Sequence, residues 1–334
     1  MPFSLAPYFH PTTVVFVDDN ENFLKSLDLE LPQSWAFRGF SEGEDALEFL
    51  NRPPALPPLV DRCFTLSVED RAHPTVALDL SLIEQEINHL DRFRRNSVVM
   101  IDYSMPLMNG LEFCAELTDH YLQKAMLTGV ADEKVAVQAF NARLIDRFIP
   151  KNTSHSISDI VAYAEEMQLA YFSQHTARLT TTLSLNPPRF LTDRDVARAV
   201  RAVMGRENVV EYYMLQYPSG FLMLRSDGSA LKMFVYEEAD VRHGLSTART
   251  RGAPEEVLQG LESRQLVLAY MDAFEDYSAA DYPWHENVLE ADIIPGRDTW
   301  FMALMTDPPA DIDFDPNRCS YNAFLRTLDE PRWS

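Results

Sequence analysis

The chain has 334 residues, which is too long for one ordinary hydrophobic core and long enough for two domains. Its hydrophobic fraction of 46% and charged fraction of 24% are typical of a soluble globular protein and exclude a disordered or fibrous one. A formal net charge of -22 disfavours binding to nucleic acids. There is neither a secretory signal nor an apolar run of the roughly 20 residues that span a bilayer, so we expect a cytoplasmic protein with no membrane partner.

Four short apolar runs in the first 151 residues predict buried strands, and polar residues follow each of them. The runs are residues 13–17, 98–101, 125–127 and 147–150. The polar residues that follow are Asp18 and Asp19, Asp102, Thr128 and Lys151, in that order. Helical patterns near residues 109–121 and 132–144 separate the later runs, and this alternation predicts an α/β doubly wound parallel sheet.

The carboxyl ends of parallel strands meet at one edge of such a sheet, so these polar side chains are expected to converge. Three crowded carboxylates need a cation, and an all-oxygen set of ligands suits Mg²⁺. The metal ion and the Lys151 ammonium would neutralise an incoming phosphoryl group while Asp102 attacks it and Thr128 bonds one of its oxygens. The pattern therefore predicts a phosphoryl-transfer site.

The stretches that carry these residues resemble the receiver, or CheY-like, family of two-component response regulators over about the first 155 to 175 residues. They are VFVDDN at 15–20, VVMIDYSMPLMNGLEF at 98–113, MLTG at 126–129 and FIPK at 148–151. The resemblance implies a flavodoxin-like fold with a five-stranded parallel sheet. It also implies that a sensor histidine kinase or a phosphotransfer protein donates the phosphoryl group.

The resemblance gives each matching residue an expected role. The implied Mg²⁺ ligands are Asp18, partly through water, Asp19, Asp102 and the backbone carbonyl of Ser104. The implied catalytic and switch residues are the phosphoacceptor Asp102, the phosphate-binding Lys151, the switch hydroxyl of Thr128 and the switch aromatic Phe148.

Two departures from the family pattern concern residues next to this site. Lys151 is followed by Asn152 instead of proline, so the cis peptide bond that the family has after this lysine is not expected. The positions two residues after the phosphoacceptor and two after Thr128 hold Ser104 and Val130, which are poorly suited to orient a hydrolytic water. We therefore expect the phosphorylated form to have an above-average lifetime.

Residues 53–96 form an insertion between the second predicted helix, near residues 43–51, and the next strand. After a proline-rich start, apolar residues recur at spacings of four and three from Val76 to Leu90, which predicts a helix over residues 76–95. Two interpretations remain open. The helix packs on the flank of the receiver, or its heptad spacing makes it a dimerisation or partner-docking helix.

A long helix is predicted from Ser154 to about Leu179, with Ser154 and Ser156 as candidate N-caps. It either conveys the state of the receiver by changing its packing or its dimer partner, or it caps the second domain. The predicted domains are a receiver at residues 1–153 with its insertion, a linker at 154–184 and an output domain at 185–334.

The last 150 residues predict an α+β output domain with a mainly antiparallel sheet. The expected helices are residues 193–204, 238–250, 254–264 and 321–328. The expected strands are residues 209–217, 220–225, 230–236, 266–271, 288–294 and 299–306. The turn Ser226-Asp227-Gly228-Ser229 predicts a hairpin between the second and third of these strands.

This region contains no familiar catalytic or DNA-binding motif. The run with Asp311, Asp313 and Asp315 either holds a divalent cation on one face or forms a solvated loop. Trp284 and His285 are a second candidate for binding. The aromatic residues of the first strands are expected to pack within the sheet; they are Tyr212, Tyr213, Tyr217 and Phe221.

The sequence thus predicts a signalling protein in which the output domain responds to phosphorylation of Asp102. A protein-interaction or ligand-sensing output is favoured, and the alternatives are an enzyme acting on a nucleotide or phosphoester and a DNA-binding regulator. No enzymatic activity is expected beyond receiver phosphotransfer and self-dephosphorylation. A homodimer or protein partner is expected to contact the last helices of the receiver, the 154–179 helix or the 76–95 helix. The layout resembles that of quorum-sensing response regulators of the Lqs type, although no residue motif outside the receiver carries this resemblance.

Overall fold

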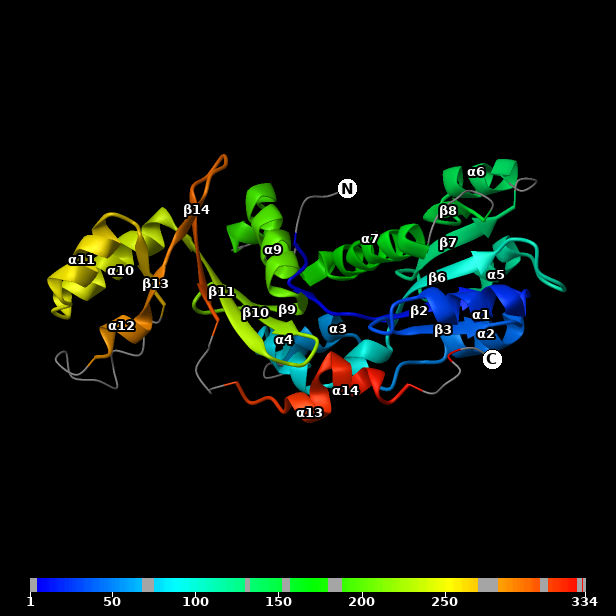
Figure 1. The fold of residues 1–334 in the computed structure, drawn as a ribbon, viewed down its shortest axis with the longest axis horizontal. Helices are drawn as coiled ribbons and strands as arrows, with labels where there is room; N and C mark the ends of the chain where they lie inside the picture. The colour runs from blue at the N-terminus through cyan, green and yellow to red at the C-terminus, as the bar shows by residue number, and fades with distance from the viewer. Residues whose placement is uncertain are drawn as a thin grey trace. The chain divides into compact units, whose positions relative to one another are not determined.

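The structure is a computed structural model, and it describes residues 5–67, 75–129, 133–151, 157–179, 188–269, 282–306, 312–328 and 332. The chain divides into two compact units, each built from segments that are distant in the sequence (Figure 1). The receiver unit consists of Phe9–Arg62, Ile87–Arg178 and Pro316–Ser334. The output unit consists of Met1–Tyr8, Cys63–Glu86 and Leu179–Asp315.

The receiver unit is built on a five-stranded parallel sheet with the strand order β3-β2-β6-β7-β8. Its strands are β2 (Thr13–Val17), β3 (Phe37–Phe40), β6 (Asn96–Asp102), β7 (Gln123–Thr128) and β8 (Arg147–Pro150). The predicted doubly wound, flavodoxin-like fold is therefore confirmed. In this order β3 and β8 are the two edge strands.

Helices cover both faces of this sheet because alternate residues of each strand point to opposite faces. Val15 and Val17 of β2 pack with α2, α5 and α6, whereas Val14 and Phe16 pack with α1 and α7. The helices are α1 (Glu21–Glu30), α2 (Gly43–Asn51), α5 (Gly110–Glu116), α6 (Glu133–Asn141) and α7 (Ile157–His175). The first half of α7 thus belongs to the receiver core, while the proposed N-caps Ser154 and Ser156 lie outside the described residues.

The receiver unit also includes the C-terminal segment of the chain, which the sequence analysis placed in the output domain. This segment contains α13 (Pro316–Cys319) and α14 (Tyr321–Leu325). The Tyr321 hydroxyl accepts a hydrogen bond from the Ala36 amide at 2.9 Å, and the rings of Phe93 and Phe324 lie 5.5 Å apart. Buried Arg92 donates to the Cys319 carbonyl at 2.9 Å. These contacts are made between residues more than 200 positions apart, which local sequence patterns do not report.

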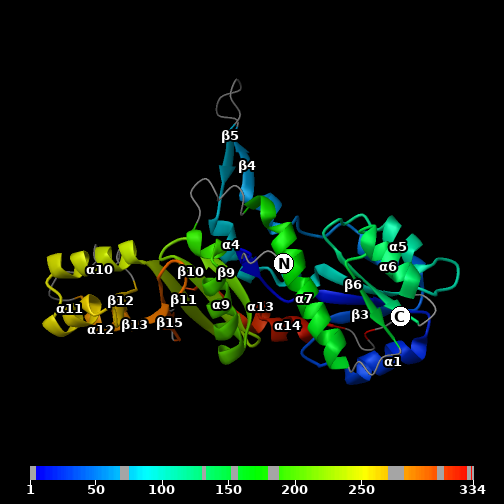
Figure 2. The same ribbon diagram turned by 90° about the horizontal axis from the view of Figure 1, so that it is seen from above.

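The predicted helix over residues 76–95 is wrong. This stretch instead contains the strand β5 (Thr75–Leu78), the short helix α4 (Ser81–Gln85) and two 3₁₀ turns, Glu86–Asn88 and Leu90–Arg94. The strand β5 pairs antiparallel with β4 (Phe64–Ser67), and the hairpin is visible in Figure 2. The Asp79 amide donates to the Cys63 carbonyl and the Asp79 carboxylate accepts from the Ser81 amide, so the chain turns between strand and helix. Strand pairing therefore overrides the apolar spacing.

The output unit contains a six-stranded sheet with the order β1-β9-β10-β11-β15-β14. These strands are β1 (Tyr8–Phe9), β9 (Val209–Leu215), β10 (Gly220–Arg225), β11 (Ala230–Glu237), β15 (Trp300–Met305) and β14 (Asp292–Ile294). The pairs from β9 to β14 are antiparallel, and the predicted hairpin aligns Leu224 with Ala230. Gly228 in its turn has φ +88°, a conformation that favours glycine. The predicted α+β output fold with a mainly antiparallel sheet is confirmed.

The remaining elements of the output unit form a smaller layer at one end of this sheet (Figure 1). They include a two-stranded sheet, β12 (Leu266–Leu268) with β13 (Val288–Glu290), and the helices α10 (Glu238–Thr250), α11 (Glu255–Glu262) and α12 (Trp284–Asn287). The predicted strand 288–294 is thus two strands in two sheets, divided at Ala291. The 3₁₀ turn η4 (Arg189–Thr192) and α9 (Arg194–Glu207) precede β9.

Candidate phosphoacceptor site

Three carboxylates converge at the carboxyl ends of the central strands β2 and β6. Asp18 follows the last residue of β2, and Asp102 is the last residue of β6. Among the described residues, Asp18, Asp19 and Asp102 can each place one carboxylate oxygen within 4.8 Å of the others. Asp18 and Asp102 are buried and Asp19 is exposed. Because β2 and β6 pair in parallel, their carboxyl ends lie side by side, which brings the carboxylates together as predicted.

Lys151 supplies the positive charge of the site. Its ammonium Nζ lies 2.6 Å from Asp18 Oδ2 and 2.9 Å from Asp102 Oδ1. Its backbone amide donates to the Thr128 carbonyl at 2.8 Å, which holds the end of β8 beside the end of β7. One ammonium faces three carboxylates, so the site keeps an excess of negative charge.

The electrostatics of Asp18 reflect its position at the buried end of the strand. Burial raises the pKa of its carboxyl group, and the ion pair with Lys151 opposes this rise. Asp18 Oδ1 also accepts a hydrogen bond from the Asn20 amide at 3.0 Å. The Asn20 side chain in turn caps α1 by accepting from the amides of Asn22 and Phe23. The turn from β2 into α1 therefore fixes the carboxylate.

The loop after Asp102 is held by residues that the sequence analysis did not single out. The Tyr103 amide donates to the Leu127 carbonyl at 3.1 Å, and the Gly110 amide donates to the Tyr103 carbonyl at 3.0 Å. A side chain at Gly110 would place its Cβ 2.7 Å from the Asp102 carbonyl oxygen, so only glycine fits. Asn109 starts α5 with a capping box. The Asn109-Gly110 pair was the sequence signal for this close approach.

Thr128 and Phe148, the expected switch pair, lie on neighbouring strands: Thr128 is the last residue of β7 and Phe148 the second residue of β8. The Thr128 side chain is fully buried, and its hydroxyl has no hydrogen-bond partner among the described residues. A buried hydroxyl without a partner is destabilising, so it is suited to bond an incoming oxygen. The half-buried Phe148 ring packs edge-on against Phe140 of α6, with ring centroids 6.4 Å apart.

The donor set of this site fits Mg²⁺. Three carboxylates in reach of one another are hard oxygen ligands, and the charge that Lys151 leaves unbalanced favours a divalent cation. Ser104 is exposed next to Asp102, at the position predicted to add a carbonyl ligand. Val130 and Asn152, which the sequence analysis also discussed, lie outside the described residues.

The candidate binding residues of the output unit do not form a comparable site. Asp313 and Asp315 are exposed and belong to no cluster of metal-ligating side chains among the described residues, and Asp311 lies outside them. His285 is exposed on α12, whereas Trp284 is buried with its ring 4.7 Å from that of Tyr282. The aromatic residues Tyr212, Tyr213 and Phe221 of β9 and β10 are buried in the core as predicted, whereas Tyr217, in the turn between these strands, is 52% exposed.

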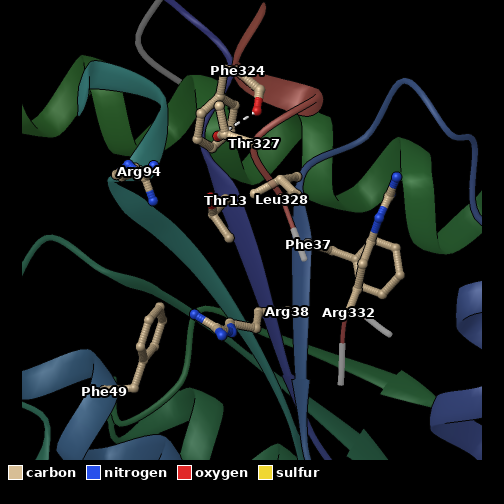
Figure 3. A pocket seen from close by; sticks show the side chains of 9 residues that line it. All are labelled: Thr13, Phe37, Arg38, Phe49, Arg94, Phe324, Thr327, Leu328 and Arg332. Carbon is tan, nitrogen blue, oxygen red and sulfur yellow. Dashed lines mark hydrogen bonds between the residues drawn. The ribbon is translucent and has the colours of Figure 1, made fainter. Parts of the chain in front are cut away.

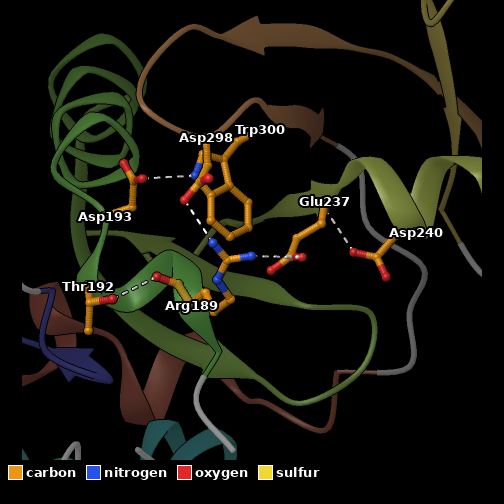
Figure 4. A network of polar contacts seen from close by, with 7 residues as sticks. All are labelled: Arg189, Thr192, Asp193, Glu237, Asp240, Asp298 and Trp300. Carbon is orange, nitrogen blue, oxygen red and sulfur yellow. Dashed lines mark hydrogen bonds and ion pairs between the residues drawn. The ribbon is translucent and has the colours of Figure 1, made fainter.

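A polar cluster in the output unit joins η4, β11 and the strand β15 (Figure 4). Arg189 lies 2.8 Å from Asp298 and 3.5 Å from Glu237. Asp193 caps α9 and accepts a hydrogen bond from the Trp300 indole at 3.0 Å. Each of these carboxylates is paired with a cation or accepts a hydrogen bond from an N–H group. The cluster therefore has a structural role and links the elements of the output unit.

The comparisons with known proteins agree with this architecture. The chain is similar to the structure of the response regulator LqsR of Legionella pneumophila, with a TM-score of 0.76 and 28% identity over 99% of each chain. It also matches a CheY-like receiver domain protein from Methanospirillum hungatei, at 16% identity over 49% of this chain and 98% of that one, with a TM-score of 0.32. No protein-family model matches the chain, and no curated protein sequence does.

Fold and site together define a response regulator with a CheY-like receiver domain in its N-terminal half. The similarity to LqsR extends through the output unit. Among the described helices, none combines the length and apolar character that a bilayer-spanning segment requires.

Proposed function

We propose that this protein accepts a phosphoryl group on Asp102 from a sensor histidine kinase or a phosphotransfer protein, and that the output unit responds. The observation that carries the proposal is the Lys151 ammonium, which pairs with Asp18 and Asp102, together with the buried Thr128 hydroxyl, which has no hydrogen-bond partner in the described part of the chain. A nucleophile, a cation and a buried donor are thus placed at the ends of three adjacent strands.

In the transfer, a carboxylate oxygen of Asp102 forms a bond to phosphorus while the bond from phosphorus to the donor imidazole nitrogen breaks. The donor nitrogen keeps the electron pair of that bond. Lys151 neutralises the oxygens of the phosphoryl group, and the Thr128 hydroxyl donates a hydrogen bond to one of them. Mg²⁺, when held by Asp18, Asp19, Asp102 and the Ser104 carbonyl, supplies further positive charge for the same oxygens.

Phosphorylation then biases an equilibrium between two conformations of the receiver. Thr128 moves toward the phosphoryl oxygen to which it donates a hydrogen bond. The Phe148 ring then moves into the space that the Thr128 side chain has left. Val137 and Phe140 of α6 are exposed apolar residues, and Phe140 packs against Phe148, so the last helices of the receiver are the surface for a homodimer or protein partner. The helix α7 belongs to this core and directly precedes the output unit in the chain order, so it conveys the change.

The proposed output is a protein-interaction or ligand-sensing module that acts in the cytoplasm. Asp313, Asp315 and His285 are exposed and belong to no cluster of metal-ligating side chains among the described residues, which gives no support to an enzyme acting on a phosphoester. The domain limits remain those proposed from the sequence, and the signal is proposed to pass through the linker at residues 154–184. Exposed Ser104 gives a hydrolytic water no acid or amide to bind, so the phosphorylated form is expected to be long-lived.

The test is the light-scattering mass of the full chain with and without Mg²⁺ and beryllofluoride, a mimic of the phosphoryl group, alongside Asp102→Asn. We expect the wild type to change mass or compactness and the variant to remain unchanged. If tryptophan or NMR titration shows that the mimic binds at Asp102 while mass and compactness stay fixed, signalling through assembly is excluded. If the mimic does not bind at all, the phosphoacceptor assignment fails.

A further inference from the structure

The aromatic ring of Phe23 contacts the ammonium of the candidate phosphoacceptor site. Lys151 Nζ lies over this ring, 5.2 Å from its centroid, which is within the range of a cation–π contact. Phe23 is the third residue of α1, and its side chain is half-buried. Besides its ion pairs with Asp18 and Asp102, the ammonium therefore has an aromatic neighbour.

The turn that fixes Asp18 also fixes Phe23. The Phe23 amide donates to the Asn20 carbonyl at 2.9 Å and to Asn20 Oδ1 at 3.3 Å. The amide of the same Asn20 donates to Asp18 Oδ1 at 3.0 Å. The Phe23 side chain packs against the buried cluster on this face of the sheet, which includes Phe16 and Leu27. Backbone and side chain thus hold the ring in a defined place relative to the Asp18 carboxylate.

Lys151 needs such a restraint more than the carboxylates do. Its side chain is 24% exposed and has a flexible four-carbon stem, so water competes for the ammonium. Electrostatic stabilisation of phosphoryl transfer depends on charges that are in place before the reaction. A ring face attracts an ammonium without neutralising it, so the positive charge stays available to the phosphoryl oxygens.

We propose that Phe23 is a positioning residue for phosphoryl transfer, whose ring holds the Lys151 ammonium where it neutralises the phosphoryl oxygens. The inference rests on the proposed function, because it requires that Asp102 accepts the phosphoryl group. Once an oxygen of Asp102 is bonded to phosphorus, the ion pair of Lys151 with this carboxylate is lost, whereas the contact with the ring does not depend on it. Phe23 acts through Lys151 and takes no part in the chemical step.

A second contact of the same kind in the receiver unit provides a matched control. The guanidinium carbon of Arg38 lies 5.2 Å from the ring centroid of Phe49, and Figure 3 shows both side chains. Phe49 lies on α2 and is half-buried, as Phe23 is. Since neither Arg38 nor Phe49 belongs to the candidate phosphoacceptor site, loss of the Phe49 ring removes a similar contact without touching the site.

The experiment measures how fast acetyl phosphate phosphorylates the full chain at saturating Mg²⁺, followed by intact-protein mass spectrometry. Phe23→Leu should slow the reaction by about three- to tenfold, which is the size of a cation–π contact partly shielded from water. Phe23→Tyr, which keeps a ring face, and Phe49→Leu should both stay within about twofold of the wild type. When Lys151→Gln is already present, Phe23→Leu should cause no further slowing, because the cation is absent.

Fluorination separates the electrostatic effect of the ring from its shape. Phenylalanine analogues with one, two and three ring fluorines at position 23 weaken the negative ring face and change its size little. The rate should fall with each added fluorine, whereas the same series at position 49 should leave it unchanged. These variants also serve if Phe23→Leu does not fold.

NMR of the metal-free full chain with labelled lysine side chains gives a readout other than activity. The Phe23 ring should shift the terminal methylene protons of Lys151 upfield, and this shift should disappear in Phe23→Leu and persist in Phe49→Leu. The inference is overturned if Phe23→Leu reacts as fast as the wild type. It is also overturned if fluorination leaves the rate unchanged, since Phe23 would then act through shape alone. A wild type that acetyl phosphate does not phosphorylate would instead refute the proposed function, and the positioning role with it.

Discussion

The phosphoacceptor site of the receiver unit and the polar cluster of the output unit contain the same kinds of side chain but balance their charges differently. In the output unit, Arg189 is shared by Glu237 and Asp298, and Asp193 is satisfied by a helix N-terminus and by the Trp300 indole. These groups are largely exposed, and their charges are balanced in place.

In the receiver unit, the Lys151 ammonium pairs with Asp18 and Asp102, the two buried members of a cluster of three carboxylates, and the buried Thr128 hydroxyl has no partner among the described residues. This arrangement is unfavourable for the folded state until another group arrives. In this chain, charges are left partly unbalanced at the candidate phosphoacceptor site. They are balanced in the polar cluster of the output unit, which serves only as a structural contact.

The largest expected effect is on phosphorylation itself. Incubation of the full chain with a small phosphodonor and Mg²⁺ should add one phosphoryl group, and Asp102→Asn should reduce this to background because the nucleophilic oxygen is lost. Intact-protein mass spectrometry measures the outcome. Asp298→Asn in the polar cluster should leave phosphorylation unchanged; loss in both variants would remove the distinction between the two regions.

The second effect is on metal binding. Saturating Mg²⁺, at about a hundred times its dissociation constant, should stabilise the receiver by about 3 kcal/mol because it balances the excess carboxylate charge. Asp19→Asn should abolish most of this stabilisation, as measured by thermal unfolding with and without the ion. Glu21→Gln, which removes an exposed carboxylate two residues away that pairs with Lys25, is the control and should retain it.

A third prediction concerns pH. Burial lowers the pKa of His175 to about 4 from the ordinary value of 6.5, so the unfolded chain takes up a proton before the folded one does. Stability should therefore fall as the pH drops through the window between 6.5 and 4, by about 2 kcal/mol between about pH 7.5 and 5 from this group.

Urea unfolding at the two pH values measures this loss, and His175→Phe should reduce it by that amount. Some loss should remain because burial also lowers the pKa of His10. His243 of the output unit is exposed, so His243→Gln should not alter the loss. An unchanged pH dependence in His175→Phe would contradict the assignment of the effect to the receiver unit.

The fourth effect is smaller and belongs to the output unit. Asp193→Ala removes the cap of α9 and the acceptor of the Trp300 indole, and it should destabilise the output unit by about 1 to 2 kcal/mol. Thr192→Ala, which removes only a hydroxyl bonded to the Arg189 carbonyl, is the neighbouring control with a smaller loss. Phosphorylation at Asp102 should be normal in both.

The smallest expected change in stability is that of Thr128→Val, a variant that should nevertheless lose its function. Thr128→Val replaces a buried hydroxyl that has no partner among the described residues with an isosteric apolar group, so the stability of the receiver should stay the same or rise by about 1 kcal/mol. The same variant should lose the response of mass or compactness to beryllofluoride. A loss of stability would show that the hydroxyl has a structural role in the resting protein.

Several features could be predicted from the sequence because the evidence was local. The continuous apolar runs of β2 and β6 predicted buried strands, and the polar residue after each run had to lie at one edge of a parallel sheet. The hairpin around Gly228 was recognisable because its turn requires particular residues at adjacent positions. By contrast, residues 76–95 had helical spacing, and pairing of β5 with β4 overrode it.

The sequence by itself determined the parallel receiver sheet, the meeting of Asp18, Asp19 and Asp102 at one edge of it and the antiparallel character of the output sheet, since strand patterns and strand-end residues act over a few positions. Only the tertiary structure decided where distant segments pack. The return of α14 to the receiver unit depends on contacts between residues more than 200 positions apart, such as Ala36 with Tyr321 and Arg92 with Cys319. Such contacts follow from three-dimensional packing, which leaves no regular spacing in the sequence.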